Sequence, residues 1–97
     1  MDPERLSDIN ISDVVRSTAG RDTDELFYVI DEDPLYLTLA NGKDRPLDRP
    51  KRKKRKHVQK VLRSETRVAD KLRLGDKVLN SELRRDLAFL AREIASE

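Results

Sequence analysis

The sequence predicts a mainly β fold: a small barrel or half-open sheet of about five strands, followed by one or two C-terminal α-helices. Short strand-like segments separated by turn residues occupy residues 9–63, which is typical of a small barrel. In residues 64–97 the apolar residues recur with a helical period instead. The 97 residues allow a single domain, and we expect the polar residues 1–8 to be disordered.

A glycine turn is expected to join the first two strands. The first strand is centred on residues 14–17, which are rich in β-branched side chains, and the second covers residues 26–30, Leu-Phe-Tyr-Val-Ile. Between them, residues 19–22 predict a turn, because Gly20 accepts a positive φ without strain and Asp22 can bond to the nearby backbone. The acidic residues 31–33 and Pro34 end the second strand.

Residues 35–39 alternate with a period of two, which predicts a third strand. One face of it is expected to contact the core and the other to face outward. The expected core residues are Leu35, Leu37 and Leu39, and the expected outward residues are Tyr36 and Thr38.

Asn41-Gly42 predicts a type I′ hairpin turn, since both central positions of that turn need a positive φ. We expect residues 43–47 to form the returning strand, with Pro46 at an edge or a bulge. Residues 58–62 would then close the sheet as a fifth strand.

Two helices are expected after the strands. Ser64 is a plausible N-cap for a short helix over residues 65–74, which Gly75 would end as a C-terminal cap. Asn80 or Ser81 would cap a second helix. This helix carries one apolar stripe that could dock on the sheet or on another protein, formed by Leu83, Leu87, Leu90 and Ile94.

The charges are strongly segregated along the chain. Residues 1–42 contain three basic and ten acidic residues, a net charge of −7, whereas residues 43–63 contain eleven basic and two acidic residues, a net charge of +9. Seven of the nine residues in 49–57 are basic, and we expect nothing within the chain to neutralise residues 51–56. A run of this density suits the phosphate backbone of a nucleic acid.

The basic run is mid-chain, between strand-like segments, so we interpret it as a binding surface rather than as a solvated tail or a nuclear-import signal. Arg16, Lys60 and Arg63 could extend it. The predicted RNA-binding residues are Arg16, Gly20, Arg21, Lys43, Arg45, Arg49, Lys51, Arg52, Lys53, Lys54, Arg55, Lys56 and His57.

The other candidate sites are weaker. His57 has no second histidine or cysteine as a partner, so we expect it to stay neutral and to make a hydrogen bond or stack. The acidic groups at residues 22–25 and 31–33 are expected to be solvated turns. Tyr36 would offer a base-stacking platform if it faces outward, although packing is the more common role.

No catalytic constellation, cofactor motif or metal-ligand cluster is visible, so we expect neither an enzyme nor a cofactor. The chain has no cysteine, no secretory signal and no apolar run long enough to span a membrane, so we expect a cytoplasmic protein.

Two stretches together resemble the KOW motif of a family of bacterial RNA-binding proteins. Residues 14–22, Val-Val-Arg-Ser-Thr-Ala-Gly-Arg-Asp, and the following strand 27–30 resemble the motif itself. Asn41-Gly42-Lys43, residues 45–47 and the run 49–58 resemble the rest of the bacterial subgroup, which is similar to KOW-containing large-subunit ribosomal proteins of archaea and eukaryotes. Asp13 and Thr23-Asp24 depart from the family pattern, which expects glycine at the first position and Lys-Gly at the second.

The resemblance implies an SH3-like barrel that binds RNA, most plausibly ribosomal RNA, with possible contacts to ribosomal proteins. Its motif glycine corresponds to Gly20, and its basic loop residues correspond to Arg21 and to residues 51–56. The sequence therefore predicts a non-enzymatic, ribosome-associated RNA-binding protein. A protein-interaction adaptor and a transcription-elongation KOW module stay open as alternatives.

Overall fold

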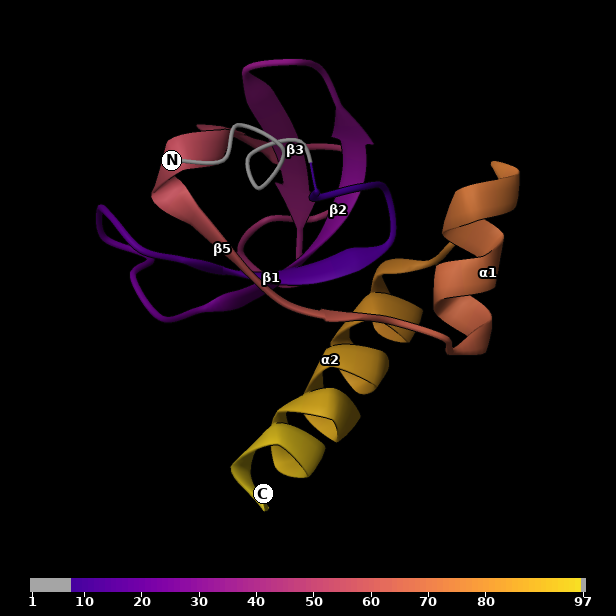
Figure 1. Cartoon of the computed structure of the whole chain (residues 1–97). Coiled ribbons are helices and arrows are strands. Elements are labelled where there is room, and N and C mark those ends of the chain that lie inside the picture. Colours follow the sequence, from indigo (N-terminus) through magenta and orange to yellow (C-terminus); the bar gives the residue numbers. More distant parts are fainter. Residues whose placement is uncertain (1–7, 97) are drawn as a thin grey trace.

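The computed structural model describes residues 8–96, and Figure 1 shows their arrangement. Five strands form one antiparallel sheet in the order β4-β3-β2-β1-β5. The single-turn 3₁₀ helix η2 (Arg55–His57) joins β4 to β5, and two helices, α1 (Arg67–Leu74) and α2 (Asn80–Ala95), follow. The strands are β1 (Asp13–Ser17), β2 (Leu26–Glu32), β3 (Tyr36–Ala40), β4 (Lys51–Lys54) and β5 (Val58–Arg63).

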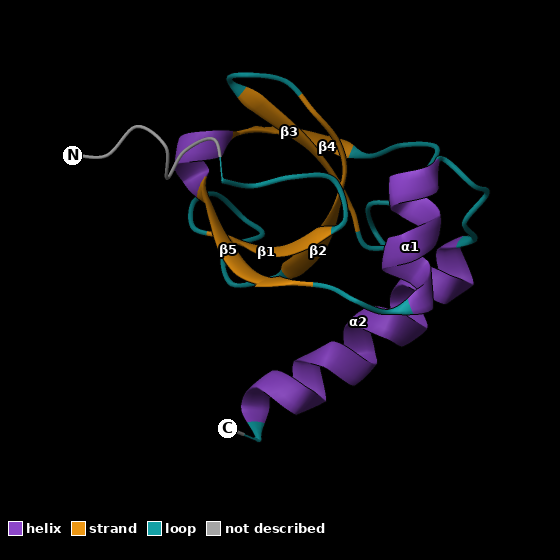
Figure 2. Cartoon of the chain, turned by 45° about the vertical axis from the view of Figure 1, so that its right-hand side comes forward, coloured by secondary structure: helices purple, strands orange, loops and turns teal. Residues whose placement is uncertain are grey.

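The predicted fold class is confirmed: a small β-barrel-like domain is followed by helices. Figures 1 and 2 show the sheet curled on itself, with both helices beside it. The disorder expected for residues 1–8 concerns, apart from Asp8, residues outside the described range.

Residues 26–30 of the central strand β2 pack on both faces of the sheet, which explains why they are all apolar or aromatic. Phe27 and Val29 point into the barrel, where they pack with Val15, Leu37 and Leu39. The intervening Tyr28 belongs instead to a second cluster on the outer face of the sheet. Because successive side chains of a strand point to opposite faces, a strand with a core on each side needs apolar residues throughout.

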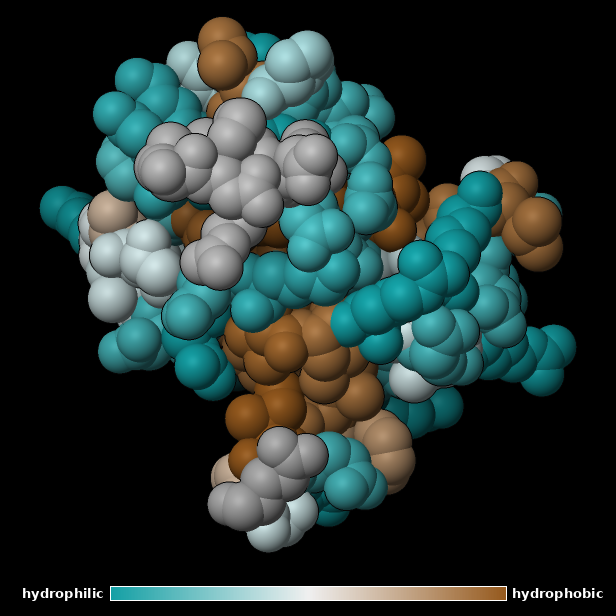
Figure 3. Space-filling model, in the orientation of Figure 1, coloured by the Kyte–Doolittle hydropathy of each residue, from teal (hydrophilic) through white to brown (hydrophobic). Residues whose placement is uncertain are grey.

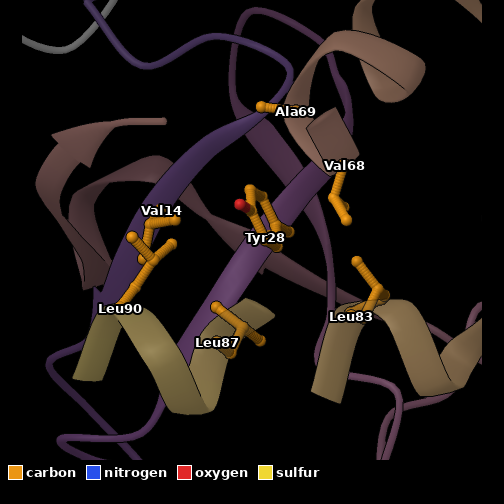
Figure 4. Packing of buried hydrophobic residues seen from close by; sticks show 8 residues of the cluster. Val14, Tyr28, Val68, Ala69, Leu83, Leu87 and Leu90 are labelled. Atoms are coloured by element: carbon orange, nitrogen blue, oxygen red, sulfur yellow. The ribbon is translucent and has the colours of Figure 1, made fainter. Parts of the chain in front are cut away.

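The second core lies between the sheet and the helices. Leu83, Leu87 and Leu90 of α2 belong to one buried cluster with Val14 and Tyr28, and Figure 4 shows Leu87 beside Tyr28 and Leu90 beside Val14. Three of the four residues of the predicted stripe therefore dock on the sheet, whereas Ile94 is only half-buried. The C-terminal part of α2 extends beyond the barrel (Figure 1). Figure 3 shows an apolar area of surface where α2 meets the barrel. Within residues 8–96, neither helix is long and apolar enough to cross a membrane.

A buried polar network fixes the helices to β2. The Tyr28 hydroxyl donates to the Asp86 carboxylate of α2 and lies 2.8 Å from Ser64 Oγ. Thr66 Oγ1 donates to the same carboxylate at 2.8 Å. Burial, followed by the hydrogen bond to the Asp86 carboxylate, raises the pKa of Tyr28 to about 12. This network ties three elements that the sequence separates widely.

The helix boundaries are close to those predicted, but the caps differ. Thr66 caps α1 by accepting a hydrogen bond from Ala69 N, while Ser64 is buried against Tyr28. Gly75 ends α1 with a φ of 74°, as expected. At α2, Glu82 accepts from Leu79 N at 2.9 Å. Neither predicted N-cap of α2 has that position, because Asn80 and Ser81 lie within the helix.

The predicted strand over residues 43–47 is wrong, because a loop over residues 41–50 precedes β4. Asn41 does not adopt the positive φ of a type I′ turn; its Oδ1 accepts from Lys43 N at 2.9 Å and Arg45 N at 3.0 Å, which folds the loop locally. Gly42 has a φ of 76° and lies directly against the start of α2. The strand that pairs with β3 is therefore formed by residues 51–54 of the basic run and not by residues 43–47.

The predicted core position of Leu35 is also wrong, since this side chain is 71% exposed. Asp33 Oδ1 accepts from Leu35 N at 2.9 Å and Tyr36 N at 2.7 Å, so residues 33–35 form a turn and β3 begins at Tyr36. Leu37 and Leu39 are buried as predicted.

Candidate nucleic-acid interface

The basic run is an ordered edge strand and not a loop. Residues 51–54 form β4, which pairs with β3, and residues 55–57 continue as η2. Their side chains alternate between two environments. We name the inward-facing set, Lys51, Lys53 and Arg55, the inner row, and the outward-facing set, Arg52, Lys54 and Lys56, the outer row. The two rows have different electrostatic partners.

Asp22 of the β1–β2 turn neutralises two cations of the inner row. Lys53 Nζ lies 2.8 Å from Asp22 Oδ1, and Lys51 Nζ lies 2.9 Å from Oδ2. Ser17 Oγ also donates to Oδ1, at 2.9 Å. Burial raises the pKa of the Asp22 carboxyl, but the hydrogen bonds from the two lysines and Ser17 outweigh it and hold the pKa well below its usual range.

The third member of the inner row is anchored at the opposite end of the strand. Arg55 is buried, and its guanidinium donates to Glu32 Oε1 at 2.7 Å and to the carbonyl oxygen of Ile9 at 3.0 Å. Its Nε donates to the carbonyl oxygen of Asp33 at 2.9 Å. Acceptors on several sides thus receive hydrogen bonds from the guanidinium, as a buried arginine requires.

Two sequence-based expectations are therefore wrong. The chain does neutralise part of residues 51–56, and the partners Asp22 and Glu32 were expected to be solvated turn residues. The strand period explains the difference, because it directs every second cation inward, where acidic residues of the first half of the chain meet it. The opposite net charges of residues 1–42 and 43–63 were the available signal.

The outer row remains on the surface. Arg52 is 63% exposed, pairs with Asp33 at 2.9 Å and lies over the Tyr36 ring, with its guanidinium carbon 4.0 Å from the ring centroid. Hydrogen bonds from the Arg52 side chain and the backbone of residues 36 and 35 lower the pKa of Asp33. Lys54 and Lys56 are exposed and form no ion pair with any residue from 8 to 96.

The glycine turn lies against the inner row of β4. Gly20 has a φ of 87°, and a Cβ there would lie 3.5 Å from Lys53 Nζ. Arg21 follows it on the exposed tip of the turn, and Arg49 is exposed in the loop before β4. His57 is half-buried at the end of η2, where its carbonyl oxygen accepts from Thr18 N at 2.9 Å.

Other predicted RNA-binding residues lie elsewhere. Arg16 and Lys43 line a separate hollow of about 570 Å³ between the β1–β2 hairpin and α2. Arg45 is half-buried in the 41–50 loop, where its carbonyl oxygen accepts from two backbone amides. Lys60 and Arg63, which could have extended the patch, pair with Asp13 at 3.3 Å and Glu65 at 2.8 Å. These residues do not join the outer row.

Comparison of the sequence with protein-family models and with curated proteins finds no match. Among the described residues, no group of three or more histidine, aspartate or glutamate side chains could hold a metal ion. The outer row offers long, positively charged side chains: Arg52 and Lys54 lie two residues apart on β4, about 6.6 Å along the strand, and Lys56 follows on η2.

Proposed function

We propose that the protein is a non-enzymatic, cytoplasmic RNA-binding protein that holds the phosphate backbone through the outer row. The observation that carries this proposal is the alternation of the basic run: the inner row is neutralised internally, whereas Lys54 and Lys56 are exposed and unpaired among the described residues. Lysine and arginine side chains that face water on one side of a rigid strand suit repeated phosphate groups.

The rigidity of the strand supports binding over a solvating role. A flexible basic tail loses conformational entropy when it binds, whereas β4 is already fixed by its pairing with β3 and by the inner row. The ion pairs of the inner row thus orient the strand that presents the outer row. Arg21 at the tip of the β1–β2 turn and Arg49 in the loop before β4 are further exposed cations.

The likeness of residues 14–22 and 41–58 to the KOW motif and its bacterial subgroup supports ribosomal RNA as the ligand class and ribosomal proteins as possible neighbours. Crosslinking in cells, followed by sequencing of the attached RNA, tests this assignment. Enrichment of ribosomal RNA is the expected result. Enrichment of nascent transcripts would favour a role in transcription elongation, and recovery of protein crosslinks alone would contradict RNA binding.

A charge-reversal experiment tests the binding surface. The double variant Lys54→Glu/Lys56→Glu should lose most of its affinity for ribosomal RNA fragments in a filter-binding titration, because it places two negative charges opposite the phosphates. The matched control Lys77→Glu/Arg85→Glu changes the same charge at exposed positions of the helical segment and should bind normally. Unchanged affinity of the first variant would show that the outer row is not the contact.

A further inference from the structure

An open hollow adjoins the outer row at the turn between β2 and β3. It has a volume of about 370 Å³ and is lined by Pro34, Leu35 and Tyr36 on one side and by residues 54–56 on the other. This volume lies at the small end of the range for ligand pockets. The hollow thus combines an apolar, partly aromatic wall with the exposed cations of Lys54 and Lys56.

The apolar wall lies at the surface of the part of the chain that the structure describes. Leu35 is 71% exposed, and its backbone N–H donates to Asp33 Oδ1 at 2.9 Å. Tyr36 faces outward from β3, opposite Lys54 in the register of the two strands, and the Arg52 guanidinium lies on its ring. A planar cation on an aromatic ring extends the flat surface on which another planar group can pack.

We propose that this hollow holds one unpaired base of the RNA, packed against Tyr36 and Leu35, while Lys54 and Lys56 contact the phosphates on either side of it. The proposal rests on the RNA-binding function proposed above and narrows its ligand to single-stranded segments, such as loops or bulges. A nucleotide supplies both required chemistries, since its base is flat and apolar on its faces and its phosphate is anionic.

An RNA duplex cannot make both contacts with this surface. Its bases are stacked and paired, so it offers phosphates to the outer row but no free base face to Tyr36. The two parts of the site therefore make separable contributions: the cations act on any RNA, and the apolar wall acts only on unpaired nucleotides. Preference for single strands should depend on residues 35 and 36.

The experiment compares an unstructured oligouridine with a blunt RNA duplex, using the full chain. Tyr36→Ala and Leu35→Ser should each weaken oligouridine binding by about fivefold or more, the loss expected for one stacked base, and leave duplex binding unchanged. Tyr36→Phe should bind like the wild type because the ring remains. Phe89→Ala, which truncates an exposed aromatic side chain of α2, is the matched control and should have no effect. Leu35→Ser alters an exposed turn, which keeps the test independent of folding.

Photocrosslinking of a thiouridine-containing oligouridine gives a second readout. The peptide that contains Leu35 and Tyr36 should carry the crosslink. Equal losses on both RNAs, no loss on either, or a crosslink confined to other peptides would overturn the base-binding hollow while leaving phosphate binding by the outer row intact. Failure of the wild type to bind either RNA would overturn both proposals.

Discussion

Lys53 of β4 and Asp22 of the β1–β2 turn form a buried ion pair, with Nζ 2.8 Å from Oδ1 and both side chains 8% exposed. Lys53 Nζ also donates to the carbonyl oxygen of Ala19. The pair joins the edge strand of the sheet to a turn about thirty residues earlier in the chain. It fixes the strand that presents the outer row, so a buried residue can still position the surface proposed to bind RNA.

Loss of Asp22 should therefore destabilise the fold. Asp22→Asn leaves Lys51 and Lys53 buried or half-buried without their carboxylate, and we expect a loss of about 3 kcal/mol in the free energy of unfolding. Urea denaturation measures it. Asp48→Asn, at an exposed position, is the control and should change stability by less than about 0.5 kcal/mol. Equal stability of the two variants would contradict the anchoring role.

The same carboxylate should make stability fall in acid. The folded-state pKa of Asp22 is lowered, so its ion pairs stabilise the fold above the ordinary aspartate value of 3.8. As the pH falls below this value, the unfolded chain takes up a proton before the folded chain does, and the stabilisation is lost. The stability difference between wild type and Asp22→Asn should shrink over that range in urea denaturation. A difference that is independent of pH would contradict the lowered pKa.

The two rows should respond differently in salt titrations of RNA binding. Lys54→Ala removes one phosphate contact, so the slope of log affinity against log salt should become shallower by about 0.7 to 1. Lys53→Met removes a cation of the inner row that is already neutralised, and below its melting temperature it should keep the wild-type slope. Equal changes in both variants would mean that Lys53 reaches the RNA as well.

The sequence was sufficient for features that depend on local pattern. The alternation of residues 35–39 placed Leu37 and Leu39 in the core, and the helical spacing of residues 83–90 identified the buried leucines of α2. The pairing of Asp22 with Lys53 was not predictable in this way, because it depends on which turn the barrel brings against β4. The predicted hairpin turn at Asn41 was wrong for a similar reason. Gly42 and Leu47 of this loop contact Asn80 of α2, which is distant in the sequence.

Leu35 and Leu37 should contribute very differently to stability, because β3 begins between them, at Tyr36. Leu37→Ala opens a cavity in the barrel core and should cost about 2–5 kcal/mol, whereas Leu35→Ala at the exposed turn should stay within about 0.5 kcal/mol of the wild type. Thermal and urea denaturation of the two variants measure the contrast. Similar losses for the two variants would mean that residues 33–35 belong to the strand, because Leu35 and Leu37 would then lie on the same face.

The approach of Gly42 to α2 can be separated from the strain of its backbone. Gly42 and Gly75 have similar positive φ values, 76° and 74°, so alanine at either position costs about 1–2 kcal/mol for the left-handed conformation. At Gly42 a Cβ would also lie 2.3 Å from the carbonyl oxygen of Asn80, whereas Gly75 has no atom within 4 Å. We therefore expect Gly42→Ala to destabilise by more than about 3 kcal/mol and Gly75→Ala to show only the smaller loss. Similar losses, measured by urea denaturation, would mean that α2 can move away from the loop without penalty.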